Sequence, residues 1–190
     1  MNTQHCLVSS DGVYLGPEVW KGDLTLRSWD YDKTLTSLGC LREVTGILIA
    51  GGFNKLEDLG NLTTVGRYLD LEGCHNLKTL GNVTTVGGAL DIENCHNLIS
   101  LGNVTTIKSH LHIIGCDKLT SIGNLNHIGE TVSLVDRYKC RTRLPGGQFL
   151  ERAKYYQEIP LHEALNAIHF DEVQDVILYK NILLNKLQGV

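Results

Sequence analysis

The residues with the clearest chemical potential are four carboxylates arranged in two pairs. Asp70 and Glu72 stand two residues apart, and Asp91 and Glu93 repeat the pair 21 residues later. Paired carboxylates can act as the acid and the nucleophile of a carbohydrate-active hydrolase, hold a divalent cation or bind a basic protein partner. They can equally form a solvated, charged face that keeps a sheet soluble.

Two histidines extend this set along the chain. His112 stands 21 residues after Asp91, and His110 precedes it by two. We take Asp70, Glu72, Asp91, Glu93, His110 and His112 together as the candidate partner-binding surface. Repeat duplication explains the pairing of the carboxylates without any chemistry, and no long loop insertion is present to build a pocket. We therefore expect a binding protein with no catalytic residues; the hydrolase is the alternative.

Cysteine and histidine are also adjacent twice, as Cys74-His75 and Cys95-His96. Such neighbours could suggest a zinc site or a thiol nucleophile. Consecutive residues on a turn point in different directions, however, so we expect the cysteines to face inward and the histidines outward. No calcium loop, phosphate-binding glycine loop or serine elbow accompanies them. We expect no metal and no cofactor.

All of these residues lie in an internal repeat, the strongest feature of the sequence. Residues 59–66 recur as residues 80–87 and 101–107, and more weakly as 122–129. The positions that share one repeat site are spaced by 21 residues: Leu38, Leu59, Leu80, Leu101 and Ile122. A divergent first coil occupies about residues 15–37, with extra residues around 30–33. The period predicts a stack of similar structural units.

The full unit is best seen in residues 59–79. Leu69-Asp70-Leu71 alternates apolar, polar and apolar residues, which predicts a short strand with Asp70 on its outer face. One coil buries about seven apolar side chains, worth roughly 10–21 kcal/mol. Ordering its 21 residues costs roughly 32 kcal/mol, so a lone coil does not fold. Stacked coils cover each other's apolar faces and pair their strands, which predicts a solenoid.

Residues 80–98, LGNVTTVGGALDIENCHNL, resemble the leucine-rich-repeat superfamily, and more narrowly its receptor L-domain type. They are also similar to short phage and bacterial repeat proteins. The resemblance covers about residues 15–136 and implies a β-rich, right-handed solenoid of short parallel strands that binds other proteins. By analogy, it implies a phage or bacterial accessory protein that binds and inhibits a host factor, such as a defence component.

The repeat fades after Asp136, and the composition then turns helical. The sequence predicts an N-terminal cap at 1–14, the solenoid at 15–143 and a C-terminal helical region at 144–190. Helices are expected at 148–158, 161–169 and 171–187. They would form a cap on the open end of the solenoid. The third presents an apolar stripe that offers a homodimer or partner interface, which includes Val173, Ile177 and Leu184.

Composition limits the expected partner and cellular location. A net charge of −4 argues against a nucleic-acid partner, which usually demands a basic surface. No stretch approaches the roughly 18 apolar residues of a membrane span. Residues 1–10 lack the basic and apolar regions of a signal peptide, so we expect a cytoplasmic protein. A protein partner with a basic surface is the leading expectation; a self-assembling structural protein is a further alternative.

Overall fold

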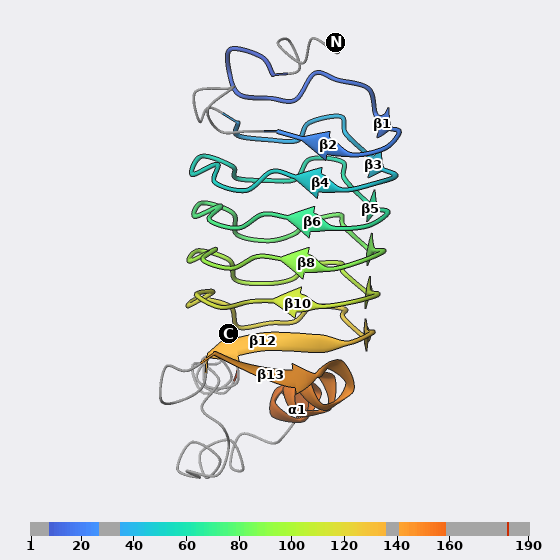
Figure 1. Ribbon diagram of the computed structural model, residues 1–190. Helices are drawn as coiled ribbons and strands as arrows, with labels where there is room; N and C mark the ends of the chain where they lie inside the picture. Colours follow the sequence, from blue (N-terminus) through green and yellow to red (C-terminus); the bar gives the residue numbers. More distant parts are fainter. Residues whose placement is uncertain (1–7, 27–34, 136–140, 159–181, 183–190) are drawn as a thin grey trace.

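The computed structural model describes residues 8–26, 35–135, 141–158 and 182. The chain winds into a rod of stacked coils, as the repeat predicts (Figure 1). In chain order the elements are β1 (Val19–Trp20), β2 (Leu24–Thr25), β3 (Glu43–Val44), β4 (Leu48–Ile49), β5 (Thr64–Val65), β6 (Leu69–Asp70), β7 (Thr85–Val86), β8 (Leu90–Asp91), β9 (Thr106–Ile107), β10 (Leu111–His112), β11 (His127–Ile128), β12 (Thr131–Val135), β13 (Arg141–Pro145) and α1 (Gly146–Glu158).

Two sheets run along the rod. The seven-stranded sheet has the order β13-β12-β10-β8-β6-β4-β2, and the six-stranded sheet has the order β1-β3-β5-β7-β9-β11. Neighbouring coils pair in parallel at an offset of 21 residues, for example Leu69 with Leu90. Only the first of these sheets was predicted from the sequence, because the Thr-Val strands of the second are too short to show an alternating pattern.

The first coil is longer than the others. Leu24 pairs with Leu48, an offset of 24 residues (48 − 24) where later coils show 21. Leu26 still donates its N–H to Ile49. The extra residues therefore lie between Leu26 and Leu35, in agreement with the insertion that the sequence predicts around residues 30–33. The inserted segment itself falls outside the described residues.

The core consists of columns of equivalent side chains. Leu48, Leu69, Leu90 and Leu111 are fully buried, and so are Val44, Val65, Val86 and Ile107 in the second sheet. Phe53 occupies the site that cysteine takes in later coils, and it is fully buried as well. Each coil thus covers the apolar edge of the next, which supplies the burial that a lone coil lacks.

A glycine opens each coil in the left-handed region. Gly39, Gly60, Gly81, Gly102 and Gly123 have φ values between 51 and 61°. Residues with a Cβ rarely adopt this conformation, so the column of glycines sets the turn that starts every coil. The asparagine that follows reaches back in one case: Asn82 Nδ2 donates to the Gly60 carbonyl at 3.1 Å.

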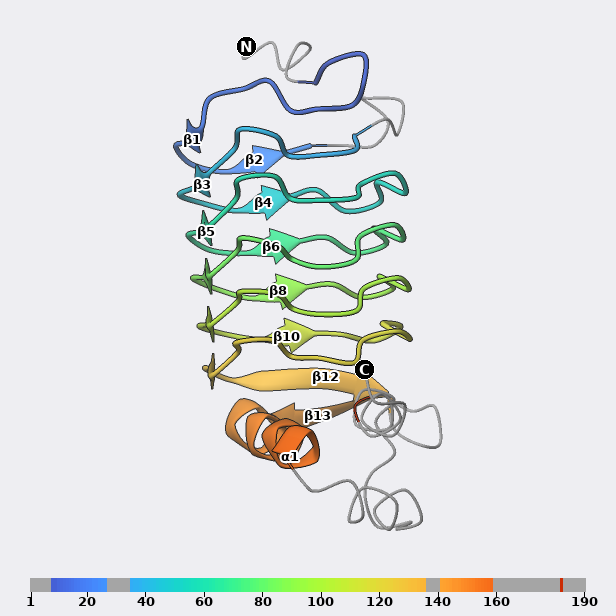
Figure 2. The same cartoon turned by 180° about the vertical axis from the view of Figure 1, so that it is seen from behind.

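An antiparallel strand and a helix end the stack. β13 pairs antiparallel with β12, and α1 packs against β11, β12 and β13 (Figure 2). Phe149 and Ala153 of α1 are fully buried, so the helix covers the last coil as a cap. The helix begins at Gly146, two residues before the expected start. Glycine allows the close approach there, since a Cβ at Gly146 would lie 2.6 Å from Ile128. The proline and glycines within residues 144–147 predict a break in the chain. This prediction is wrong, because β13 passes directly into α1.

Candidate functional site

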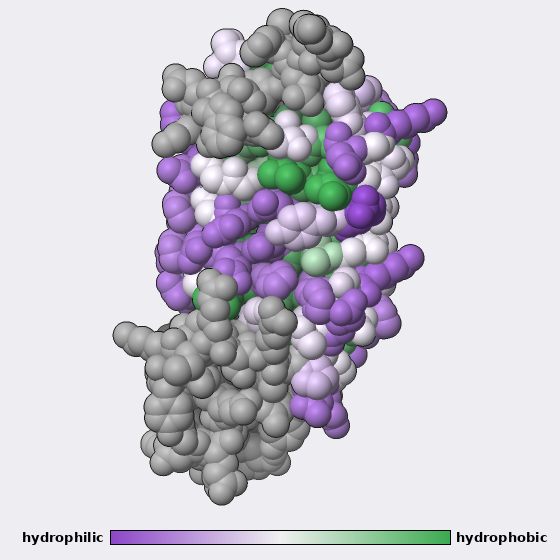
Figure 3. Space-filling model, viewed as in Figure 1, coloured by the Kyte–Doolittle hydropathy of each residue, from purple (hydrophilic) through white to green (hydrophobic). Residues whose placement is uncertain are grey.

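The seven-stranded sheet places the two aspartates side by side. Asp70 ends β6, Asp91 ends β8, and the two are register partners. Leu69 and Leu71 on either side of Asp70 are fully buried, so the aspartate must project from the outer surface. Figure 3 shows polar surface over β6 and β8 on this side of the rod. We call Asp70, Glu72, Asp91 and Glu93 the acidic patch.

Each aspartate also shapes its own turn. Asp70 Oδ1 accepts a hydrogen bond from the Glu72 N–H at 3.0 Å, and Asp91 Oδ1 accepts one from the Glu93 N–H at 3.0 Å. Aspartate commonly bonds the backbone two residues ahead in this way. The sequence predicted a surface role for these residues, but this structural role in the turn was not predicted.

Tyr68 belongs to the same site, although the sequence analysis did not select it. Its hydroxyl donates to Asp91 Oδ2 at 3.0 Å, so its ring extends from its own coil toward the next. Burial raises the pKa of Tyr68 far above its usual range, and the charges of Asp91 and Asp70 raise it further. The phenol therefore remains a donor. Its position two residues before Asp70 was the available signal, because alternate residues share a face.

Asp70, Glu72 and Asp91 form no ion pair with another described residue. The ion pairs in the described part of the chain all involve histidine: His96 with Asp117, His110 with Glu130 and His112 with Glu93. None includes Asp70, Glu72 or Asp91. Burial raises the pKa of Asp70; the hydrogen bond from the Glu72 N–H opposes this, and the charges of Asp91 and Glu72 add to it. Among the described residues, the negative charges of Asp70, Glu72 and Asp91 are thus not compensated by an ion pair.

The two glutamates differ in exposure. Glu72 is exposed, whereas only 7% of Glu93 is accessible. His112 Nδ1 lies 3.9 Å from Glu93 Oε1, so this histidine adjoins the patch. The expected two-by-two array is therefore uneven: Asp70, Glu72 and Asp91 are available to a partner, and Glu93 is largely withdrawn.

His110 is held by groups outside the patch. Its Nε2 lies 2.9 Å from Glu130 Oε2, and its Nδ1 lies 3.0 Å from Thr131 Oγ1. Ser109 Oγ donates to the other carboxylate oxygen of Glu130 at 3.0 Å. Because an ionised carboxylate only accepts, a neutral His110 donates from Nε2 and accepts from the Thr131 hydroxyl at Nδ1. These bonds fix the imidazole 6.1 Å from the ring of His112.

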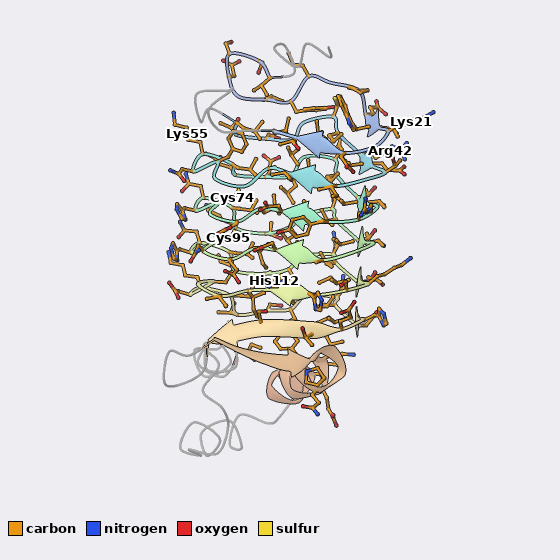
Figure 4. All side chains as sticks on the ribbon, in the orientation of Figure 1. Lys21, Arg42, Lys55, Cys74, Cys95 and His112 are labelled. Atoms are coloured by element: carbon orange, nitrogen blue, oxygen red, sulfur yellow. The ribbon has the colours of Figure 1, made fainter. Side chains whose placement is uncertain are left out.

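The cysteines face inward and the neighbouring histidines outward, as the turn argument predicts. Cys74, Cys95 and Cys116 are buried, and each thiol donates to a carbonyl oxygen of the preceding coil at 2.9–3.2 Å. Burial raises the pKa of Cys74 and of Cys116 to about 12, which disfavours the reactive thiolate. Figure 4 labels Cys74 and Cys95 on successive coils.

His75 and His96 stack outside this column, with ring centroids 5.1 Å apart. His75 Nδ1 bonds the Asn94 carbonyl at 2.9 Å, and His96 Nδ1 lies 3.2 Å from Asp117 Oδ2. Within the described ranges no three metal-binding side chains gather. Val173, Ile177 and Leu184, the predicted interface of the C-terminal helices, lie outside the described residues.

The fold defines the class: the chain is a parallel β-solenoid with 21-residue coils, two sheets and a C-terminal capping helix. It matches no protein-family model, no curated protein and no solved structure. Over the described ranges, no helix is both long and apolar enough to cross a membrane.

Proposed function

We propose that this solenoid is a protein-interaction module that binds a partner with a basic surface through the acidic patch. The observation that carries the proposal is that Asp70, Glu72 and Asp91 form no ion pair with any cation in the described part of the chain. Like charges on neighbouring strands destabilise a sheet, so the patch has a cost that the fold does not need to bear. A cationic partner would relieve that repulsion and gain long-range steering.

The distribution of positive charge supports the same proposal. Lys21 and Arg42 lie at one edge of the rod and Lys55 lies at the opposite edge, away from the patch between them (Figure 4). None of these three cations lies over β6 or β8, the strands that carry the patch (Figure 4). A partner with matching basic groups would be favoured over one with acidic groups.

Affinity capture from a cell lysate tests the proposal. The bait is compared with an Asp70→Asn, Glu72→Gln and Asp91→Asn variant, in which asparagine keeps the oxygen that accepts the turn hydrogen bond. Glu93 is left unchanged because it is largely buried. A charge-matched control replaces Glu18, Glu43 and Glu57 by glutamine. We expect a partner that the bait and the control capture and the patch variant loses. Equal capture by all three would refute the role of the patch.

Finer proposals rest on the sequence resemblance alone. We propose a relation to leucine-rich-repeat proteins of the L-domain type, and a cytoplasmic phage or bacterial accessory protein that inhibits a host defence factor. Identification of the captured partner in a bacterial lysate tests this role. The hydrolase, and a structural protein that assembles through its C-terminal helices, remain alternatives that no contact among the described residues favours.

A further inference from the structure

The surface beside the acidic patch is apolar. Ile49 is the register partner of Asp70, and Asp70 is the register partner of Asp91, so the three form one outward row along the rod. Ile49 on β4 and Ile47, the residue before this strand, are both half-buried. Figure 3 shows a small apolar area over β4, directly beside the polar surface over β6. The row thus changes from aliphatic to acidic within one coil.

Two features keep this apolar area accessible. Gly51 occupies the site at which later coils carry Glu72 and Glu93, so no glutamate side chain stands beside Ile49, and Asp70 Oδ1 lies only 2.8 Å from where a Cβ of Gly51 would be. Tyr68 lies next to Ile47 in the adjoining coil, since Leu48 donates its N–H to the Tyr68 carbonyl at 2.8 Å. The ring of Tyr68 then reaches toward Asp91, which places an aromatic wall along the aspartate pair.

We propose that the partner docks here as an extended segment carrying an aliphatic residue, any residue and then arginine or lysine. This inference rests on the proposed function and names the ligand of the same site. The aliphatic side chain would contact Ile47 and Ile49. The cation would lie between Asp70 and Asp91, beside the Tyr68 ring, where it gains both carboxylates and a cation–π contact.

The spacing follows from the geometry of the sheet. Neighbouring strands are roughly 4.8 Å apart, so the midpoint between Asp70 and Asp91 is roughly 7.2 Å from Ile49. Two residues of an extended chain advance roughly 6.8 Å and return the side chain to the same face. Adjacent residues would point to opposite faces, and a separation of four would overshoot by roughly 6 Å. One intervening residue therefore fits best.

Fluorescence anisotropy with labelled peptides tests the spacing. The probe is Gly-Ser-Leu-Ser-Arg-Ser-Gly. The comparison peptides place leucine and arginine adjacent, separate them by three intervening residues, or replace arginine by glutamate. We expect the probe to bind at least roughly tenfold more tightly than each comparison peptide, the size of one lost charged contact. Its affinity should fall as salt rises through the range that screens exposed charges.

Protein variants locate the site. Ile49→Thr introduces the residue that Thr25 supplies in the same row, and it should weaken the probe severalfold without altering the salt dependence. Asp70→Asn with Asp91→Asn should weaken it and flatten the salt dependence. Glu57→Gln, an exposed acid elsewhere, should change neither. Circular dichroism confirms that each variant is folded.

The outcomes distinguish a failure of the proposed peptide ligand from a failure of the proposed protein-interaction function. Equal binding of all peptides, no binding of the probe at millimolar concentration, or an unchanged affinity in Ile49→Thr would overturn the docking geometry. If the patch variant still loses its captured partner in that case, the proposed function stands without this ligand. If the control and the patch variant capture alike, both proposals fail.

Discussion

Replacing Asp70 by asparagine should stabilise the protein at neutral pH. Asp70 is half-buried beside Asp91, and burial is the main cause of its raised pKa. Asparagine keeps the Oδ1 that accepts the Glu72 N–H at 3.0 Å, so the turn after β6 should survive. The substitution removes the negative charge and little else. It therefore isolates the energetic cost of the acidic patch.

The size of the effect follows from the sheet geometry. Two charges roughly 4.8 Å apart repel by roughly 0.9 kcal/mol in water, and by roughly 3.5 kcal/mol at an effective dielectric constant of 20. Measured cross-strand pairs give roughly 0.2–1 kcal/mol, and Asp70 is accessible enough for solvent screening to hold. We expect a gain of about 0.5–1 kcal/mol in the free energy of unfolding, or about 1–4 °C in Tm for a chain of this length.

The gain should depend on pH with a definite sign. The folded-state pKa of Asp70 lies above its ordinary value of 3.8, so between the two values the folded state binds more protons than the unfolded state. The contribution of Asp70 to stability therefore falls as pH rises through this window. Above the folded-state pKa the full penalty is present. The advantage of Asp70→Asn should be complete at pH 7 and should disappear as pH falls to 3.8.

Urea unfolding followed by circular dichroism, from pH 7 down to pH 4, measures the difference. Glu57→Gln is the control, because this exposed acid lies away from the patch and should show no comparable gain. A loss of stability in Asp70→Asn at pH 7, or a gain that is constant over the whole range, would refute the electrostatic reasoning.

Three further predictions concern the coil itself. Gly60→Ala should lower the free energy of unfolding by roughly 3 kcal/mol, and Gly81→Ala should lower it by roughly 1–2 kcal/mol. Both glycines have a positive φ, but only at Gly60 would a Cβ overlap the carbonyl oxygen of the preceding coil. Equal losses in urea unfolding would contradict this reasoning. Asn94→Ala should lower the free energy of unfolding by about 1 kcal/mol in the same assay, whereas Asn94→Gly should leave it nearly unchanged. The φ of Asn94 is 60°, a value that glycine tolerates. An unchanged stability in the alanine variant would exclude backbone strain at this position. Iodoacetamide should modify the partly accessible Cys40 before Cys95, because burial raises the pKa of Cys95 far above its usual range. Peptide mapping identifies the labelled cysteine. If Cys95 were labelled first in the folded protein, its coil would open readily.

Much of the fold could be predicted because identical residues recur at one period. The spacing of Leu59, Leu80 and Leu101 defines the coil, and Leu69-Asp70-Leu71 identifies a strand and its outer face. The second sheet could not be predicted in the same way. Its two-residue strands, such as Thr64–Val65, are defined by hydrogen bonds between coils and not by a local pattern.

The end of the solenoid shows the limit of local turn signals. Pro145, Gly146 and Gly147 predict a break in the chain, yet Pro145 ends β13 and Gly146 starts α1. The Gly146 N–H donates to the Glu130 carbonyl at 2.7 Å, and its missing Cβ lets the helix approach Ile128. A glycine that allows close packing and a glycine that breaks a helix have the same sequence signal.

The site was predictable in outline for the same reason as the strand. Alternation places Asp70 and Asp91 outward, and the period places them together. The low exposure of Glu93 and the bond from Tyr68 to Asp91 depend on neighbours one or more coils away. Contacts of that kind follow from side-chain reach across coils, which a single repeat does not reveal.

The pairing of equivalent residues in parallel register also makes the rod extensible. Residues 59–79 and 80–100 are nearly interchangeable, so recombination between them could insert or delete a whole coil in frame. Each such event would change the distance between the first coil and the capping helix by one strand spacing, roughly 4.8 Å. It would also add or remove one Asp-x-Glu pair on the outer face, and the strand pairing with the neighbouring coils would be preserved. The length and the charge of the solenoid would therefore change together, by one fixed increment for each coil.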